Sequence, residues 1–429
     1  MNKFFGIEEK GSSIKTEVLA GITTFLTMVY IVIVNPAILS SAGIPFDQVF
    51  MATIISAAIG CLIMGLFANY PIGIAPGMGL NAYFASVVAT HGLSYQIVLG
   101  TVFIAGLLFI LLSVSNLRQK LITAIPSTLK YAIGSGIGLF IAFVGLKNSG
   151  IIVANESNLI GLGNLTDPVV LLTFFGLFIT LILMIRKVQG ALFFGMAITA
   201  VVGYFCNMLD FNGVASLPPA PVFFDIDLAG VFTHGLYAVV FSFVLVTMFD
   251  TTGTMVAVSE QAGLAKDGHF PRAKRAFLAD STATTVGATF GTSPSTAFIE
   301  SLTGVALGGR TGLTAVVIGV LFLVTMFFSP LIGAISSLAS ITAPVLIIVG
   351  CFMMDGMARI KWNEFDEAFP AFLVILAMPL TGSIATGIAF GFISYPILKL
   401  VGGKGKEVHP LIYLFGLLFF IQLVFFPAH

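Results

Sequence analysis

Two acidic side chains stand inside apolar stretches of this sequence. Asp250 lies near the middle of FVLVTMFDTTGTMVAV (243–258), with threonines beside it, and Glu300 follows the polar segment TSPST (292–296). An ionisable group at the centre of a membrane costs about 2.5–3.5 kcal/mol on insertion scales, so such groups face one another or a water-filled cavity. We therefore expect Asp250 and Glu300 to face a polar cavity, where water, a ligand or a proton satisfies them.

Carboxylates in such a cavity suit a small planar ligand, because a carboxylate accepts two hydrogen bonds side by side from adjacent N–H groups of a heterocycle. Backbone N–H groups at helix breaks can donate to a ring carbonyl or ring nitrogen. Phe298 or Phe84 can stack on a flat ring, although core packing is the alternative interpretation for any one of 42 phenylalanines. The predicted substrate-binding residues are Asn81, Asp250, Thr296, Phe298 and Glu300.

The two acids also predict a role in proton coupling. Two carboxylates that share a buried site can hold a proton between them, so Asp250 and Glu300 are interpreted as the proton-coupling pair. Asp280, in LADSTATT, has a different interpretation. It stands next to Ser281 and Thr282, which favours a carboxylic acid that hydrogen-bonds a neighbouring helix and holds the two together.

The composition places these residues in a lipid bilayer. Of 429 residues, 58% are hydrophobic and 9% are charged, and apolar runs of about twenty residues recur along the chain. We predict an all-α polytopic membrane protein with a single membrane domain over residues 1–429. The stretch 410–426 is left open as a further crossing or an interfacial segment. The fourteen predicted spans are 18–38, 49–68, 76–90, 95–114, 128–146, 168–185, 188–207, 236–261, 273–290, 294–307, 311–330, 338–356, 368–383 and 385–402.

The positive charges predict the orientation, since Lys and Arg gather in cytoplasmic connectors. With this count of spans, only Lys147 falls on the outer side. The chain is therefore expected in the plasma membrane, with Met1 and Lys406 both cytoplasmic. The residues that support this orientation are Lys3, Lys10, Lys15, Arg118, Lys120, Lys130, Arg186, Lys187, Lys266, Arg272, Lys274, Arg275, Arg310, Arg359, Lys361, Lys399, Lys404 and Lys406.

The chain also contains two similar halves, 18–207 and 236–402. Their third spans are both short and carry glycine and proline: GIAPGMGLNAYF (73–84) and GTSPSTAFIESLTG (291–304). Seven spans per half is an odd number, so the second half must insert upside down as an inverted repeat. Paired broken spans indicate a transporter's binding site, whereas the alternative is that Gly and Pro merely ease helix packing. In this arrangement the two breaks meet, and Asn81 approaches Glu300.

At these motifs the sequence resembles the AzgA-like purine permeases of the nucleobase/ascorbate transporter family. The matching motifs are APGMGLNAYF, FDTTGT and GTSPSTAFIESLTGVALGGRTG, and the similarity runs from about Thr16 to Pro410. The resemblance implies a uracil-permease fold, with core spans within 18–114 and 236–330 and gate spans within 128–207 and 338–402. It implies proton-coupled purine uptake served by Asn81, Asp250 and Glu300. Because Ser301 follows Glu300 where uracil and xanthine relatives carry Asn, it favours hypoxanthine, guanine or adenine.

Purine transport has two alternatives. An anion transporter of the same fold is the alternative, although two acids in the pocket oppose it. An intramembrane hydrolase that uses Asp250 and Glu300 as acid and base is the third; no nucleophile–base pair or metal-ligand spacing accompanies them. We expect no enzyme activity, cofactor, metal or nucleic-acid partner. Purine, proton and lipid are the expected partners, and a homodimer is left open.

Overall fold

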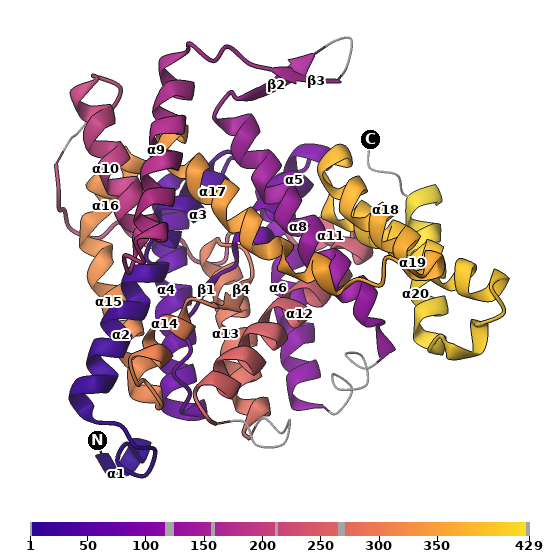
Figure 1. The fold of residues 1–429 in the computed structure, drawn as a ribbon, viewed down its shortest axis with the longest axis horizontal. Helices are drawn as coiled ribbons and strands as arrows, with labels where there is room; N and C mark the ends of the chain where they lie inside the picture. Colours follow the sequence, from indigo (N-terminus) through magenta and orange to yellow (C-terminus); the bar gives the residue numbers. More distant parts are fainter. Residues whose placement is uncertain (1, 116–123, 156–158, 211–212, 265–270, 426–429) are drawn as a thin grey trace.

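The computed structural model describes residues 2–115, 124–155, 159–210, 213–264 and 271–425. Most of these residues are helical, and nine helical segments among them are long and apolar enough to cross a membrane. Two shorter apolar helices, Ala191–Phe205 and Pro410–Val424, accompany them. The chain is therefore a multi-pass membrane protein. The N-terminus lies at the lower edge of Figure 1, opposite the paired strands β2 (Ile152–Asn155) and β3 (Leu159–Leu162).

The first half of the chain runs from the N-terminal helix to the end of α10. Its elements are α1 (Asn2–Phe5), α2 (Ile14–Met28), α3 (Ile31–Ser40), α4 (Phe46–Ile63), the π-helical turn η1 (Met64–Ala68), β1 (Ile74–Pro76), α5 (Met78–His91), α6 (Tyr95–Val114), α8 (Ser127–Asn148), β2 (Ile152–Asn155), β3 (Leu159–Leu162), α9 (Pro168–Ile185) and α10 (Ala191–Phe205).

The second half begins with a short helix before the long helix that carries Asp250. Its elements are α11 (Leu228–Thr233), α12 (Tyr237–Gln261), α13 (Ala273–Phe290), β4 (Ser295–Ala297), α14 (Ser301–Ala306), α15 (Gly312–Thr325), η2 (Met326–Phe328), α16 (Ser329–Ser336), α17 (Ala339–Met353), η3 (Met354–Arg359), α18 (Phe365–Thr381), α19 (Ile384–Val401), η4 (Gly405–Glu407) and α20 (Pro410–Phe425).

Several predicted spans are divided in the structure, among them 18–38 and 311–330. The segment 18–38 becomes α2 and α3, because the N–H groups of Val32 and Ile33 reach back only three residues and tighten one turn between the helices. The segment 311–330 becomes α15, η2 and α16. Pro330 stands in the first turn of α16, where its missing N–H removes no helical hydrogen bond, so it favours a new helix start there.

The prediction of an all-α chain is wrong in one respect, because the structure contains two short two-stranded sheets. In the first, β1 pairs antiparallel with β4, and the opposed residues are Ile74 with Ala297, Ala75 with Thr296 and Pro76 with Ser295. Proline and glycine interrupt the helices here, and backbone groups that leave a helix inside a membrane must find other partners. Strand pairing supplies those partners at the centre of the molecule (Figure 1).

The helices fall into two sets that pack chiefly within themselves. In one set, α2, α4, α6, α12, α13 and α15 pack together, and α4, α12 and α13 contact the β1–β4 pair. In the other, α8 packs on α17 and α18, α9 packs on α10 and α17, and α19 packs on α18 and α20. The two sets meet where α12 of the first set contacts α8 and α20 of the second. Helix α5 also contacts α8. The first set therefore holds the two broken spans, and the second covers one side of them.

Candidate functional site

The β1–β4 pair is held from both ends and from the side. The N–H of Gly77 donates to the Pro294 carbonyl (3.0 Å) and that of Phe298 donates to the Gly73 carbonyl (2.9 Å), which extends the ladder beyond the strands. Hydroxyls support it laterally, since the Ser56 and Ser295 oxygens lie 2.7 Å apart. The predicted meeting of the two breaks is confirmed, and the strands fix the residues that follow them.

Asp250 lies in the middle of α12, beside β4. Its side chain is exposed although it sits deep in the molecule, because it lines an internal cavity. The Thr296 hydroxyl of β4 hydrogen-bonds the Asp250 carboxylate. The adjacent Thr251 points away and donates to the Asp280 carboxylate of α13 (2.5 Å). As expected, Asp280 is a fully buried contact between helices.

Glu300 lies between β4 and α14. The Tyr30 hydroxyl donates to its carboxylate at 2.7 Å, and Glu300 also lies close enough to Asp250 for their charges to interact. The structure therefore brings Asp250, Thr296 and Glu300 together. Tyr30 was missed by the sequence analysis, because a tyrosine in the apolar run TMVYIVIV gives no signal that separates it from core packing.

Asn81 lies in the first part of α5 and is fully buried. Its side-chain oxygen accepts a hydrogen bond from the Ser293 hydroxyl, so the polar residues of the two breaks do meet. Among the described residues, the Asn81 amide nitrogen has no hydrogen-bond partner, and no hydrogen bond joins Asn81 to either carboxylate. Its role in substrate binding remains a prediction.

The two candidate aromatic residues differ in position. Phe298 follows β4 and packs against Tyr30, with ring centroids 6.4 Å apart. Phe84 is fully buried in the hydrophobic core. Phe298 therefore adjoins the acidic residues through Tyr30, whereas Phe84 serves packing.

The internal cavity next to Asp250 has a volume of about 470 Å³. This size is typical of small-molecule sites. Of the predicted site residues, only Asp250 lines it, while Thr296 and Glu300 interact with Asp250 without lining the cavity. The lining residues are Gly79, Leu80, Lys130, Tyr131, Ile133, Gly134, Ile137, Val246, Phe249, Asp250, Thr252, Gly253, Thr254, Ile299, Met353, Asp355, Gly356 and Arg359.

The cavity has one apolar wall and one charged end. Apolar side chains of α8 and α12 form its sides, and its charged lining residues are Lys130 near the start of α8 and Asp355 and Arg359 of η3, besides Asp250. Neither Asp250 nor Glu300 forms an ion pair within the described part of the chain. The site can therefore accept N–H donors through its carboxylates. Among the described residues, no group of three or more His, Cys, Asp or Glu could hold a metal ion.

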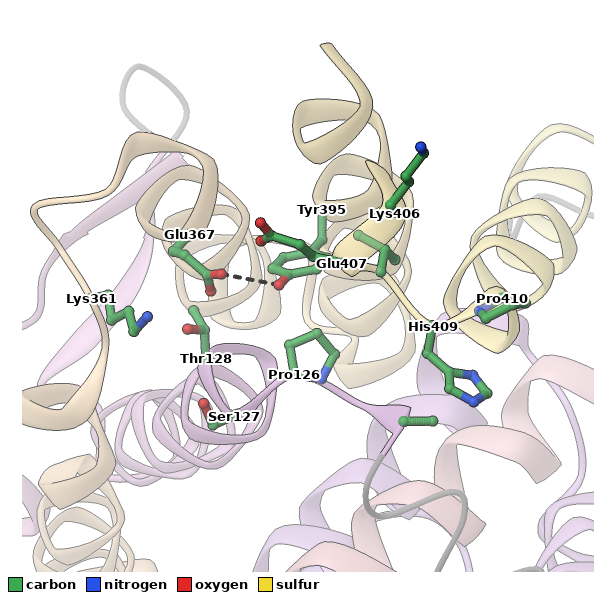
Figure 2. A pocket seen from close by; sticks show the side chains of 12 residues that line it. Pro126, Ser127, Thr128, Lys361, Glu367, Tyr395, Lys406, Glu407, His409 and Pro410 are labelled. Atoms are coloured by element: carbon green, nitrogen blue, oxygen red, sulfur yellow. Dashed lines mark hydrogen bonds between the residues drawn. The ribbon is translucent and has the colours of Figure 1, made fainter. Parts of the chain in front are cut away.

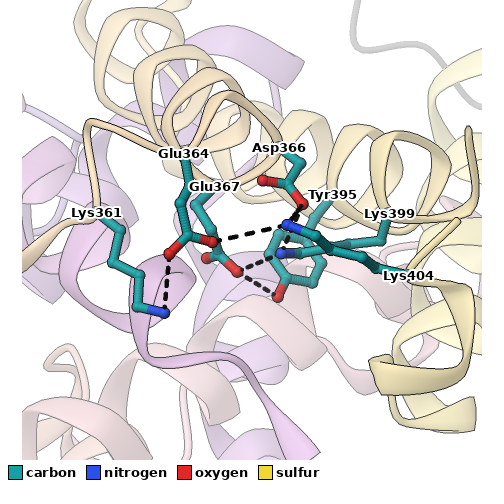
Figure 3. Close-up of polar contacts among 7 residues, drawn as sticks. All are labelled: Lys361, Glu364, Asp366, Glu367, Tyr395, Lys399 and Lys404. Carbon is teal, nitrogen blue, oxygen red and sulfur yellow. Dashed lines mark hydrogen bonds and ion pairs between the residues drawn. The ribbon is translucent and has the colours of Figure 1, made fainter. Parts of the chain in front are cut away.

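A second group of charged residues lies at the start of α18. The Lys399 ammonium contacts Asp366 at 2.9 Å and Glu367 at 2.7 Å, and Lys404 contacts Asp366 at 3.0 Å. The Tyr395 hydroxyl donates to Glu367 at 3.0 Å. Figure 3 shows these side chains converging from α18, from α19 and from the turn after it, so we call them the α18–α19 charge cluster.

A polar cavity of about 540 Å³ adjoins this charge cluster. Figure 2 shows Glu367 and Tyr395 on one side and His409 on the other. None of the predicted site residues lines it. The lining residues are Ala124, Pro126, Ser127, Thr128, Lys361, Glu367, Tyr395, Lys406, Glu407, Val408, His409 and Pro410.

Comparisons with known proteins agree with the motifs. The profile of the Permease family (Xan_ur_permease) matches residues 15–390. The guanine/hypoxanthine permease PbuO of Bacillus subtilis is 60% identical over 98% of this chain and 99% of its own. The adenine permease AdeP of Escherichia coli is 46% identical over 100% of this chain and 97% of its own.

A solved structure shares the fold at low sequence identity. The transmembrane domain of the cyanobacterial bicarbonate transporter BicA superposes with a TM-score of 0.66 and is 16% identical, over 87% of this chain and 97% of that one. At that identity the likeness concerns the arrangement of the helices alone.

Proposed function

The chain belongs to the Permease family, and from that premise we propose that it is a secondary active transporter that imports purine nucleobases by proton symport. It is a permease and not an enzyme. The observation that carries the proposal is the pair of carboxylates, Asp250 and Glu300, which lie beside the cavity and form no ion pair within the described part of the chain. Relatives named guanine/hypoxanthine permease and adenine permease support hypoxanthine, guanine or adenine as the substrate.

We assign the substrate to the cavity at Asp250. A carboxylate accepts two N–H donors side by side, which matches adjacent ring and exocyclic N–H groups of a purine. The Thr296 hydroxyl hydrogen-bonds Asp250, and the Tyr30 hydroxyl hydrogen-bonds Glu300. Asn81 and Phe298 are proposed to complete the site when the helices move around the bound base.

Proton coupling is assigned to the same two acids. When both are ionised they repel each other across a short distance, and no lysine or arginine of the described chain neutralises them. A proton bound with the substrate removes that repulsion and leaves one acid able to donate. Substrate and proton therefore favour each other's binding, which is the requirement for symport.

The architecture that we propose for transport has fourteen spans in a seven-plus-seven inverted repeat. Its core spans lie within 18–114 and 236–330 and its gate spans lie within 128–207 and 338–402, which is supported by the two sets of helices that pack mainly within themselves. The N-terminus is proposed to be cytoplasmic, in the plasma membrane. The cavity then opens to the cytoplasm at Lys130 and Arg359.

Uptake assays test this function directly. Cells that lack their own purine permeases, expressing this chain, are expected to accumulate radiolabelled hypoxanthine, guanine or adenine, and a protonophore should abolish the accumulation. Uptake that depends on sodium and survives the protonophore would refute proton coupling. Absence of purine uptake, together with anion-dependent currents, would favour an anion transporter. The likeness to the bicarbonate transporter concerns the fold alone and does not favour that outcome.

A further inference from the structure

Glycines inside the helices of this protein stand mostly where another helix comes very close. A Cβ atom added at Gly138 would lie 2.6 Å from the Gly350 carbonyl oxygen, and one added at Gly106 would lie 2.6 Å from the Thr285 hydroxyl. A side chain cannot fit at such distances. These glycines are explained by helix packing, which is common in membranes.

Gly134 and Gly253 do not follow this rule. A Cβ atom added at either would have no heavy atom within 4 Å, and neither has a positive φ. The other described glycines with such open surroundings all have a positive φ, which explains them by backbone conformation. Neither packing nor backbone geometry therefore accounts for glycine at positions 134 and 253.

Both of these glycines line the cavity next to Asp250. Gly253 lies on α12, three residues after Asp250 and hence on the same helix face, and Gly134 lies on α8, four residues after Lys130. The helices α8 and α12 contact each other and belong to the two different packing sets. The two glycines thus stand on facing elements between the acid and the charged end of the cavity.

An alanine at either position would fit and would strengthen the helix, since glycine is a poorer helix former than alanine. The sequence forgoes this gain at two places in the same cavity. The space left by the missing side chains is the remaining physical reason for glycine there.

We propose that Gly134 and Gly253 are specificity-determining residues that keep the passage between Asp250 and the charged end wide enough for a flat bicyclic base. This inference rests on the proposed purine transport. The two glycines set the clearance, so the passage admits an unsubstituted planar heterocycle and rejects one with bulky substituents.

The test is a graded series at both positions: Gly134→Ala, Gly134→Leu, Gly253→Ala and Gly253→Leu. Initial uptake of radiolabelled hypoxanthine should fall moderately with Ala and at least tenfold with Leu, while the melting temperature of the purified Ala variants stays equal or rises. Gly138→Ala is the matched control, because its Cβ would strike Gly350 and lower the melting temperature. Wild-type uptake of the Leu variants would overturn the proposal, and so would an equal loss with Ala and Leu, since that indicates a need for helix flexibility.

A second measurement separates this inference from the transport function. In a background of Cys206→Ser and Cys351→Ser, which removes the two exposed cysteines, Gly134→Cys and Gly253→Cys should react with a small water-soluble thiol reagent in inverted vesicles. Gly138→Cys should resist the reagent. Labelling at 134 and 253 without purine uptake by wild type would refute the purine function and leave the open passage standing. Absence of labelling in a protein that does take up purines would refute the passage alone.

Discussion

Two pairs of carboxylates in this molecule have opposite surroundings. Asp366 and Glu367, at the start of α18, are neutralised by Lys399, whose side chain is 4% exposed. Asp250 and Glu300 meet a tyrosine and a threonine hydroxyl but no cation within the described chain. The first pair has its charge satisfied by the fold and serves to join α18 to α19. No ion pair within the described chain balances the charge of the second pair, so a ligand or a proton can interact with it. We therefore place the function at Asp250 and Glu300.

The largest effect is expected from replacing Lys399, which neutralises Asp366 and Glu367. Lys399→Met leaves Asp366 and Glu367 without their shared partner, and breaking a buried ion pair on one side costs about 3–5 kcal/mol. The melting temperature of the purified protein should fall steeply. Asp366→Asn with Glu367→Gln in the same variant should restore much of it, because no unpaired charge then remains. An unchanged melting temperature in Lys399→Met would contradict the structural role of the α18–α19 charge cluster.

Substitutions of Asp250 and Glu300, the acids at the cavity, should lower transport and leave stability intact. Asp250→Asn and Glu300→Gln remove carboxylates that have no cation, so the melting temperature should hold or rise. Purine uptake should fall roughly 10- to 150-fold, because a hydrogen bond to a charged group contributes about 1.5–3 kcal/mol. Glu260→Gln, at the exposed end of α12, is the matched control and should leave uptake unchanged. Normal uptake by both cavity variants would end the site assignment.

Tyr30→Phe sharpens the comparison, because it removes the hydroxyl that bonds Glu300 and keeps the ring that packs on Phe298. A lost side-chain hydrogen bond of this kind costs about 0.5–1.5 kcal/mol. We expect uptake to fall several-fold and its dependence on external pH to shift, with little change in stability. An unaltered pH profile of uptake would show that Tyr30 serves packing only.

The smallest effect is expected from replacing Lys404, at the exposed edge of the α18–α19 charge cluster. Lys404 contacts Asp366 at 3.0 Å, but its side chain is 42% exposed. Exposed ion pairs contribute little to stability and are screened by salt. Lys404→Ala should lower the melting temperature slightly at low salt and not at high salt. A loss as large as that of Lys399→Met would mean that burial does not distinguish the two lysines.

The sequence predicted the positions of many spans closely. The predicted ranges 95–114, 168–185 and 273–290 coincide with α6, α9 and α13. The helices α6 and α9 are long apolar runs between polar connectors, so the bilayer thickness and the composition together limit where they begin and end. The meeting of the breaks was also predictable, since two Gly- and Pro-interrupted spans in an inverted repeat must enter from opposite faces.

Other features could not be read from the sequence. The partners of Glu367 at Tyr395 and Lys399 lie about thirty residues away on another helix, and their contact depends on how far α19 is rotated about its axis. Tyr30, which donates to Glu300, lies in the tightened turn between α2 and α3, and hydropathy does not register such a local change. Asp250 lines the cavity and Glu300 does not. This difference also depends on how the helices pack, which the sequence does not state.

The ladder between β1 and β4 limits how this protein can move. Separating the two strands inside the bilayer would leave their peptide groups without hydrogen-bond partners, because no water is present there. Each unpaired group costs several kcal/mol. Chain segments more than two hundred residues apart are thus clamped into one mechanical part, which carries Thr296 on its strand and Glu300 just beyond it. A movement that exposes the cavity to one side of the membrane must therefore displace this part as a unit against α8. The two strands stay paired during that movement.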